Sequence, residues 1–115
     1  MARLGERIGA QLFIANYFNC ADAFRYLGQG VTTAILVHDV MAMRKRSLTA
    51  MGLPLDFDET MIEREKAAFA AADICITIKE EDADFIRNAC PGTQAVTLPF
   101  CMPVAEERPI ARVRT

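Results

Sequence analysis

The segment that decides the fold is TTAILVH, residues 32–38. It holds four consecutive apolar residues, 34–37, without any alternation of polar and apolar side chains. A strand of this kind is buried on both faces, which is typical of a parallel sheet covered by helices. We therefore take residues 32–38 as a strand of such a sheet.

Strands and helices are predicted to alternate on both sides of this segment. The other expected strands are residues 10–17, 73–78 and 94–98, and the expected helices are 19–27, 41–51, 59–72 and 80–89. Asn19 and Asp58 stand where they can cap two of these helices. The alternation implies right-handed crossovers and a sheet of about four parallel strands with helices on both sides. The predicted fold is α/β, Rossmann-like, with three α/β/α layers.

Length and composition fit one globular domain. The chain has 115 residues and a mass of 12.7 kDa, with 52% hydrophobic and 24% charged residues. These proportions argue against a wholly disordered chain. We expect a Rossmann-like α/β domain over residues 1–104 and a polar, linker-like tail over residues 105–115, which carries three arginines and no core-forming period.

The charge pattern and the hydropathy exclude several classes of protein. The formal net charge is −2 and the pI is about 5.4, so the overall basic character of a nucleic-acid binder is missing. No apolar stretch approaches the ~20 residues that span a bilayer, and the N-terminus does not resemble a signal peptide. We expect a cytoplasmic location, and contact with the inner membrane face stays open.

The four cysteines do not suggest a metal site. Cys20, Cys75, Cys90 and Cys101 form no CxxC pair, and the single His38 is distant from them in sequence. A structural zinc site needs four ligands, usually in close pairs. We expect reduced thiols and no bound metal, and Cys75 lies in an apolar run where a thiol behaves as a small hydrophobe.

Candidate binding residues follow the predicted strands. In open α/β sheets, ligands bind beyond the carboxyl ends of the strands. Asn16 and Tyr17 end the first strand, and His38 and Asp39 end the second. Histidine titrates near neutral pH and can donate or accept a hydrogen bond at a polar ligand. The alternative is that Asp39 caps the next helix and His38 is a satisfied residue at a strand end.

Charged residues of the predicted helices have structural explanations beside functional ones. Arg44 belongs to a basic triplet, residues 44–46, that either neutralises a phosphate or forms a solvated helix face. Glu63 and Glu65 are explained by favourable charge near a helix N-terminus. No GxGxxG, GxxxxGK[ST] or GxSxG motif is present.

Five segments together carry a family resemblance. They are FIANYF (13–18), AILVHD (34–39), EREKAAFAAADICITI (63–78), EEDADFIRNACPG (80–92) and AVTLPF (95–100). From Ala10 to Pro99 the chain resembles the later part of the N-terminal domain of GT-B fold glycosyltransferases, in the family-four-like group. It departs from that family at Lys79, where a serine is usual, and at 99–101, where Pro-Asn-Gly is common. The family's first βα unit and its C-terminal domain have no counterpart.

The resemblance implies part of an enzyme that moves a sugar from a nucleotide-sugar donor to a glycan or lipid-linked acceptor. The donor is a substrate, and no cofactor or metal is implied. His38 matches a position close to the transferred sugar, and Asp39 and Arg44 match the acceptor-side wall of the cleft. The catalytic residues stay unassigned, and we expect the chain alone to be inactive because transfer requires both walls.

Two other functions and one mode of association stay open. The chain can be a non-enzymatic α/β binding or regulatory module, since fold does not fix function. A small hydrolase using His38 and Asp39 is less favoured, because Ser47, the only serine, lies within a predicted helix. The glycosyltransferase interpretation also predicts an exposed sheet edge through which a dimer forms.

Overall fold

The computed structural model of the chain describes residues 9–55 and 58–99, and the predicted tail at 105–115 lies outside them. The elements come in the predicted order. The strands are β1 (Leu12–Asn16), β2 (Thr32–Val37), β3 (Ile74–Thr77) and β4 (Gln94–Thr97). The helices are the 3₁₀ helix η1 (Phe18–Tyr26) and the α-helices α2 (Met41–Ala50), α3 (Glu59–Ala71) and α4 (Glu80–Ala89).

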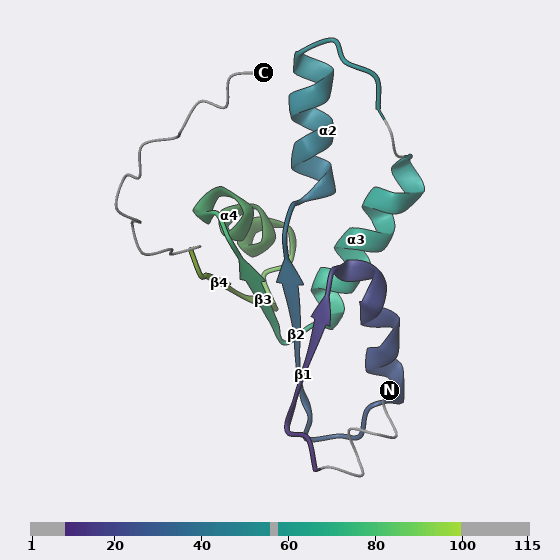
Figure 1. Cartoon of the computed structure of the whole chain (residues 1–115), viewed down its shortest axis with the longest axis vertical. Helices are drawn as coiled ribbons and strands as arrows, with labels where there is room; N and C mark the ends of the chain where they lie inside the picture. The colour runs from purple at the N-terminus through teal and green to yellow at the C-terminus, as the bar shows by residue number, and fades with distance from the viewer. Residues whose placement is uncertain (1–8, 56–57, 100–115) are drawn as a thin grey trace, which may run out of the picture.

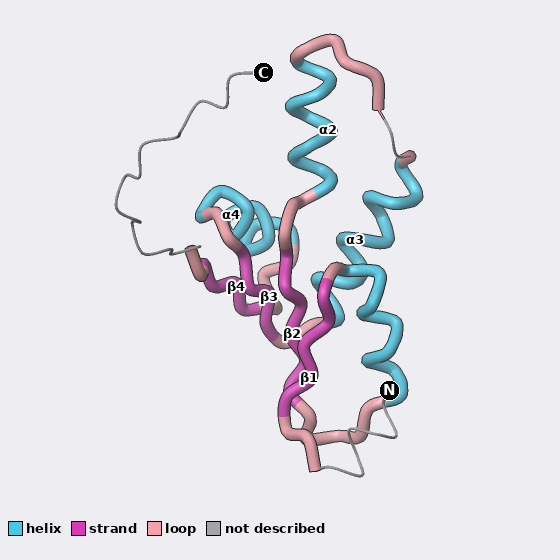
Figure 2. The backbone as a smooth tube through the Cα atoms, viewed as in Figure 1, coloured by secondary structure: helices cyan, strands magenta, loops and turns pink. Residues whose placement is uncertain are grey.

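The four strands form one parallel sheet in the order β1-β2-β3-β4 (Figures 1 and 2). The register aligns Ala15, Ile35, Cys75 and Ala95 in one row across the sheet. The sequence prediction of an α/β protein with about four parallel strands is therefore confirmed, and the arrangement is consistent with a Rossmann-like three-layer fold.

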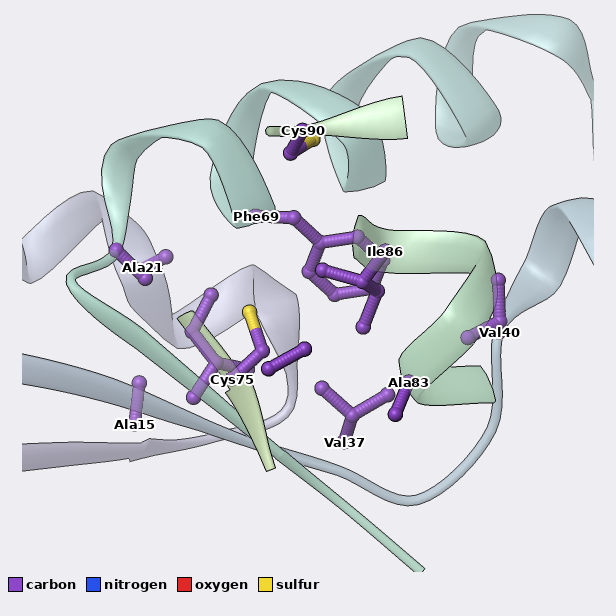
Figure 3. Close-up of a cluster of buried hydrophobic side chains, with 12 residues drawn as sticks. Ala15, Ala21, Val37, Val40, Phe69, Cys75, Ala83, Ile86 and Cys90 are labelled. Atoms are coloured by element: carbon purple, nitrogen blue, oxygen red, sulfur yellow. The ribbon is translucent and has the colours of Figure 1, made fainter. Parts of the chain in front are cut away.

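One face of the sheet carries the hydrophobic core. The side chains of Val37 and Cys75 point toward Phe69 of α3 and Ile86 of α4 (Figure 3). Ile35 belongs to the same cluster, and all five residues are at most 3% exposed. Helices η1 and α3 pack against each other beside β1 and β2, while α4 contacts β3 and β4. Burial of these side chains is the main stabilising contribution in a domain of this size.

The opposite face of the sheet carries aliphatic side chains that are not part of this core. Ala34 is 1% exposed yet does not belong to the core cluster, and Leu12 and Ile14 are about half exposed. Neighbouring strands in chain order, joined by right-handed crossovers, place their connecting helices on one side. The helices that contribute buried residues to the core cluster are η1, α3 and α4.

The predicted helix caps had different outcomes. Asp58 caps α3 as expected, because its Oδ1 accepts a hydrogen bond from Met61 N at 3.0 Å. Asn19 does not cap η1, since the helix begins earlier and Tyr17 holds the N-cap position. In α3, Phe69 is buried in the core, whereas Met61 in the first turn is 38% exposed.

Candidate functional site

Three predicted residues meet at the carboxyl edge of β1 and β2. His38 Nε2 lies 2.6 Å from Asn16 Oδ1, and the rings of Tyr17 and His38 stack at a centroid distance of 4.3 Å and an angle of 25°. An amide oxygen can only accept, so the Nε2–H of His38 donates to it. In the neutral imidazole, Nδ1 is then the hydrogen-bond acceptor. The arrangement fixes both the tautomer and the ring plane of His38.

The backbone of Tyr17 is in an unusual conformation. Its φ of 70° makes it the one non-glycine among the described residues with a positive φ. A bulky residue in this region costs about 1–3 kcal/mol, and such strain is concentrated at functional sites. Its N–H donates to Leu36 O at 3.2 Å, and its C=O accepts from Cys20 N at 3.3 Å. This turn from β1 into η1 places the Tyr17 ring against His38.

Asp39 and Arg44 lie apart from that cluster, in a neighbouring hollow. The hollow has a volume of about 380 Å³ and lies between α2 and the start of α4. Its lining carries charges of both signs: Asp39, Met43, Arg44, Ser47, Lys79, Glu81 and Asp82. The five predicted residues therefore form two neighbouring groups along the carboxyl edge, Asn16–Tyr17–His38 and Asp39–Arg44.

Asp82 is a residue of this hollow that the sequence analysis did not single out. Its side chain is 2% exposed, and Oδ2 is buried without a hydrogen-bond partner among the described residues. Burial raises the pKa of Asp82; Lys79 opposes this rise, while Asp39 and Glu81 add to it. At the third position of α4 an acidic residue is expected for the helix dipole alone, so no sequence signal marks its burial.

Glu65 of α3 holds the beginning of α2 in place. Its carboxylate is buried and accepts hydrogen bonds from Met41 N at 2.7 Å and Ala42 N at 3.3 Å. Burial raises the pKa of Glu65 despite these two bonds. The prediction that Glu65 serves its own helix N-terminus is wrong, because it serves that of α2. The alternative that Asp39 caps α2 is also wrong, because Val40 holds the N-cap position and no side chain caps the helix there.

The start of α4 is tied to β4 by a second set of polar contacts. Glu80 accepts hydrogen bonds from Arg87 Nη1 at 2.7 Å and from the Thr97 hydroxyl. These two bonds lower the pKa of the Glu80 carboxyl. Thr77 Oγ1 donates to Lys79 O at 3.0 Å. These contacts fix Lys79 at the rim of the hollow, directly after β3.

No protein family, no curated protein and no solved structure matches this chain. Within residues 9–55 and 58–99, no group of three or more histidine, cysteine or acidic side chains is placed to hold a metal ion. No helix in that part of the chain has the length and apolar character needed to cross a membrane.

Proposed function

We propose that this chain forms one wall of a glycosyltransferase cleft. The observation that carries the proposal is the His38 imidazole at the carboxyl edge of the sheet, held by Asn16 and Tyr17 beside the hollow. With Nε2 engaged, Nδ1 is an acceptor of fixed direction for a sugar hydroxyl. Fixed polar groups at a strand end are what orientation of a hydroxyl-rich substrate requires.

The neighbouring hollow supplies the acceptor side of the same wall. Asp39 offers hydrogen-bond acceptors to sugar hydroxyls, and Arg44 and Lys79 add positive charge. The substrates in this proposal are a nucleotide-sugar donor and a glycan or lipid-linked acceptor. The intact enzyme works in the cytoplasm, at the inner membrane face when the acceptor is lipid-linked. Transfer needs a second wall, so the chain alone has no turnover.

A non-enzymatic binding module is the second candidate. It is favoured by the mutual contact of Asn16, Tyr17 and His38, which satisfies Nε2 and covers the ring without any ligand. In that case the three side chains stabilise the β1–η1 turn and bind no sugar.

The two candidates differ in how the backbone amides respond to sugars. We would titrate the ¹⁵N-labelled chain with UDP-glucose, GDP-mannose and short neutral glycans, and follow the amides of Tyr17, His38 and Asp39. The proposal predicts saturable shifts at these amides with at least one sugar. It also predicts that His38→Ala weakens the response about tenfold, the loss of one well-oriented hydrogen bond.

Met51→Ala is the control, because Met51 is 70% exposed at the far end of α2. It must leave the shifts unchanged. Absence of any saturable shift, or shifts that His38→Ala does not weaken, would overturn the glycosyltransferase proposal and leave the binding module. Sugar transfer from a radiolabelled donor by the chain alone would contradict the requirement for a second wall.

A further inference from the structure

The two edges of the sheet are not equally protected. β1 and β4 are the edge strands, on opposite sides of the sheet (Figure 1). An edge strand presents unpaired N–H and C=O groups that can pair with another chain, and proteins often shield such edges with charged side chains. The two edges differ in how their outward backbone N–H and C=O groups are shielded.

The β4 edge is covered by Arg87. Gln94 N donates to Asp73 O, just before β3, and Leu98 N donates to Thr77 O of β3, so Ala95 turns its backbone groups outward. The outward C=O of Ala95 accepts a hydrogen bond from Arg87 Nη2 at 2.9 Å. The same guanidinium is held by Glu80 at 2.7 Å and Asp84 at 2.9 Å. A fixed charged side chain thus lies across this edge and opposes the addition of a strand.

The β1 edge has no such cover among the described residues. Thr32 N donates to Gln11 O and Tyr17 N donates to Leu36 O, so the odd-numbered residues of this strand face β2. The outward N–H and C=O groups consequently belong to Leu12, Ile14 and Asn16. The strand LFIAN contains no proline and no charged residue.

The same three residues point their side chains to the face away from the core. Leu12 is 50% and Ile14 is 51% exposed, whereas Ala15 of the same strand is buried on the core face. The register continues this face through Ala34, Leu36, Ile74, Ile76 and Val96, with the polar Thr32 and Gln94 toward the amino ends of their strands, and none of these side chains is charged. An uncharged apolar surface is matched by another uncharged apolar surface rather than by a charged partner.

We infer that β1 is the dimerisation strand of this protein and that its partner is a second copy of the chain. Two β1 strands pair antiparallel about a twofold axis at Ile14, which places Ile14 opposite its own copy and Leu12 opposite Asn16 of the other chain. The outward groups of both strands are then hydrogen-bonded, and the sheet becomes continuous across the dimer. The exposed Leu12 and Ile14 side chains of both copies gather on one face.

The position of Ile14 makes this pairing self-complementary. It is the central residue of a five-residue strand and carries a large apolar side chain. A twofold axis at any other residue of β1 would leave outward groups of the strand unpaired. The inference does not rest on the proposed glycosyltransferase function, because it is argued from the exposure and the backbone groups of β1. Asn16 takes part in the pairing through its backbone groups, while its side chain contacts His38.

The test is the mass of the whole chain in solution as a function of concentration. Light scattering coupled to gel filtration, and sedimentation equilibrium, are expected to show the mass rising from 12.7 kDa toward twice that value. Ile14→Lys adds a charge to the interface, and it is expected to raise the dimer dissociation constant at least tenfold. Ile14→Pro removes an outward N–H without touching the bonds to β2 and is expected to have the same effect.

Leu98→Lys is the matched control. Leu98 is 67% exposed just after β4, so the same charge is added at the protected edge, where no change in dimerisation is expected. Far-UV circular dichroism of each variant confirms that the fold is retained. A constant mass of 12.7 kDa up to about 1 mM, where even weak strand pairing is populated, would overturn the inference. Equal effects of Ile14→Lys and Leu98→Lys would overturn the assignment to β1.

Discussion

At the scale of single residues, Tyr17 combines a strained backbone with a contact to the proposed sugar-binding residue. Its φ is 70°, a region that glycine enters without steric cost, while its ring stacks on His38. Tyr17→Gly and Tyr17→Ala both remove the ring, but only glycine relieves the strain. We expect the glycine variant to unfold with a free energy about 1 kcal/mol higher than the alanine variant. Urea denaturation measures this difference, and a more stable alanine variant would contradict the assigned strain.

The charge of Asp82 gives a second prediction at this scale. Burial raises the pKa of Asp82, so the folded protein binds its proton more tightly than the unfolded chain does. The contribution of Asp82 to the free energy of unfolding therefore falls as the pH rises. The fall begins near the ordinary pKa of an aspartate, about 3.8, and continues through the raised pKa of Asp82 in the folded protein. A neutral amide is less costly to bury than a carboxylate. Asp82→Asn should therefore be the more stable protein at pH 7, by about 1 kcal/mol.

The pH dependence separates this explanation from a simple repacking effect. The stability gain of Asp82→Asn over the wild type should be small near pH 4 and grow as pH rises, because only the wild type loses a proton at this position. Urea denaturation at several pH values provides the curve. Glu63→Gln, an exposed change on α3 at a residue that does not shift the pKa of Asp82, should show no such growth. A gain that is constant across pH would contradict the role of the Asp82 charge.

At the scale of elements, α2 depends on one side chain of another helix. Glu65 satisfies the N–H groups of Met41 and Ala42, which are among the four donors that a helix N-terminus leaves without intrahelical partners. Glu65→Ala leaves both unsatisfied and should lower the unfolding free energy by about 1–3 kcal/mol. Glu65→Gln keeps one acceptor oxygen and should lose less.

Hydrogen exchange tests this attachment locally. In Glu65→Ala the amides of Met41 and Ala42 should exchange faster than in the wild type, together with other amides of α2. Glu63→Ala is the control, because Glu63 is exposed on the same helix, while the hydrogen bonds to Met41 and Ala42 come from Glu65. Unchanged protection in Glu65→Ala would show that α2 is held in place by other contacts.

The elements also show what a sequence can and cannot predict here. The apolar run at 34–37 sufficed to predict a parallel sheet, and strand ends sufficed to place Asn16, Tyr17 and His38 at one edge. Their mutual contact depends on the strand register and on the positive φ of Tyr17, neither of which has a local sequence signal. Glu65 was misassigned because its partners lie 24 and 23 residues earlier in the chain.

Asp73 also makes contacts that its place in the sequence does not reveal. It lies in residues 63–78, one of the five segments on which the sequence predicts a likeness to glycosyltransferases. In the structure its carboxylate accepts hydrogen bonds from Thr33 N at 2.8 Å and from the Thr33 hydroxyl at 3.2 Å. Those contacts join the starts of β2 and β3, at the edge opposite the candidate site. A motif residue can therefore be explained by sheet assembly without any part in binding.

At the scale of the whole molecule, the two faces of the sheet differ in what they contribute to folding. Side chains of the core face meet α3 and α4, whereas those of the other face do not join the core cluster. This asymmetry follows from strands laid down in chain order with their helices on one side. It predicts that the same substitution has unequal costs on the two faces.

Ile35 and Ile76 provide the matched pair for that prediction. Both lie on inner strands of the sheet, but Ile35 is fully buried on the core face and Ile76 is half-buried on the other. Threonine keeps the β-branch that suits a strand, so each change mainly places a hydroxyl where a hydrocarbon stood. Ile35→Thr should lower the unfolding free energy by about 2–4 kcal/mol and Ile76→Thr by less than about 1 kcal/mol. Urea denaturation of both variants measures the two costs, and equal losses would mean that the second face is covered as completely as the first.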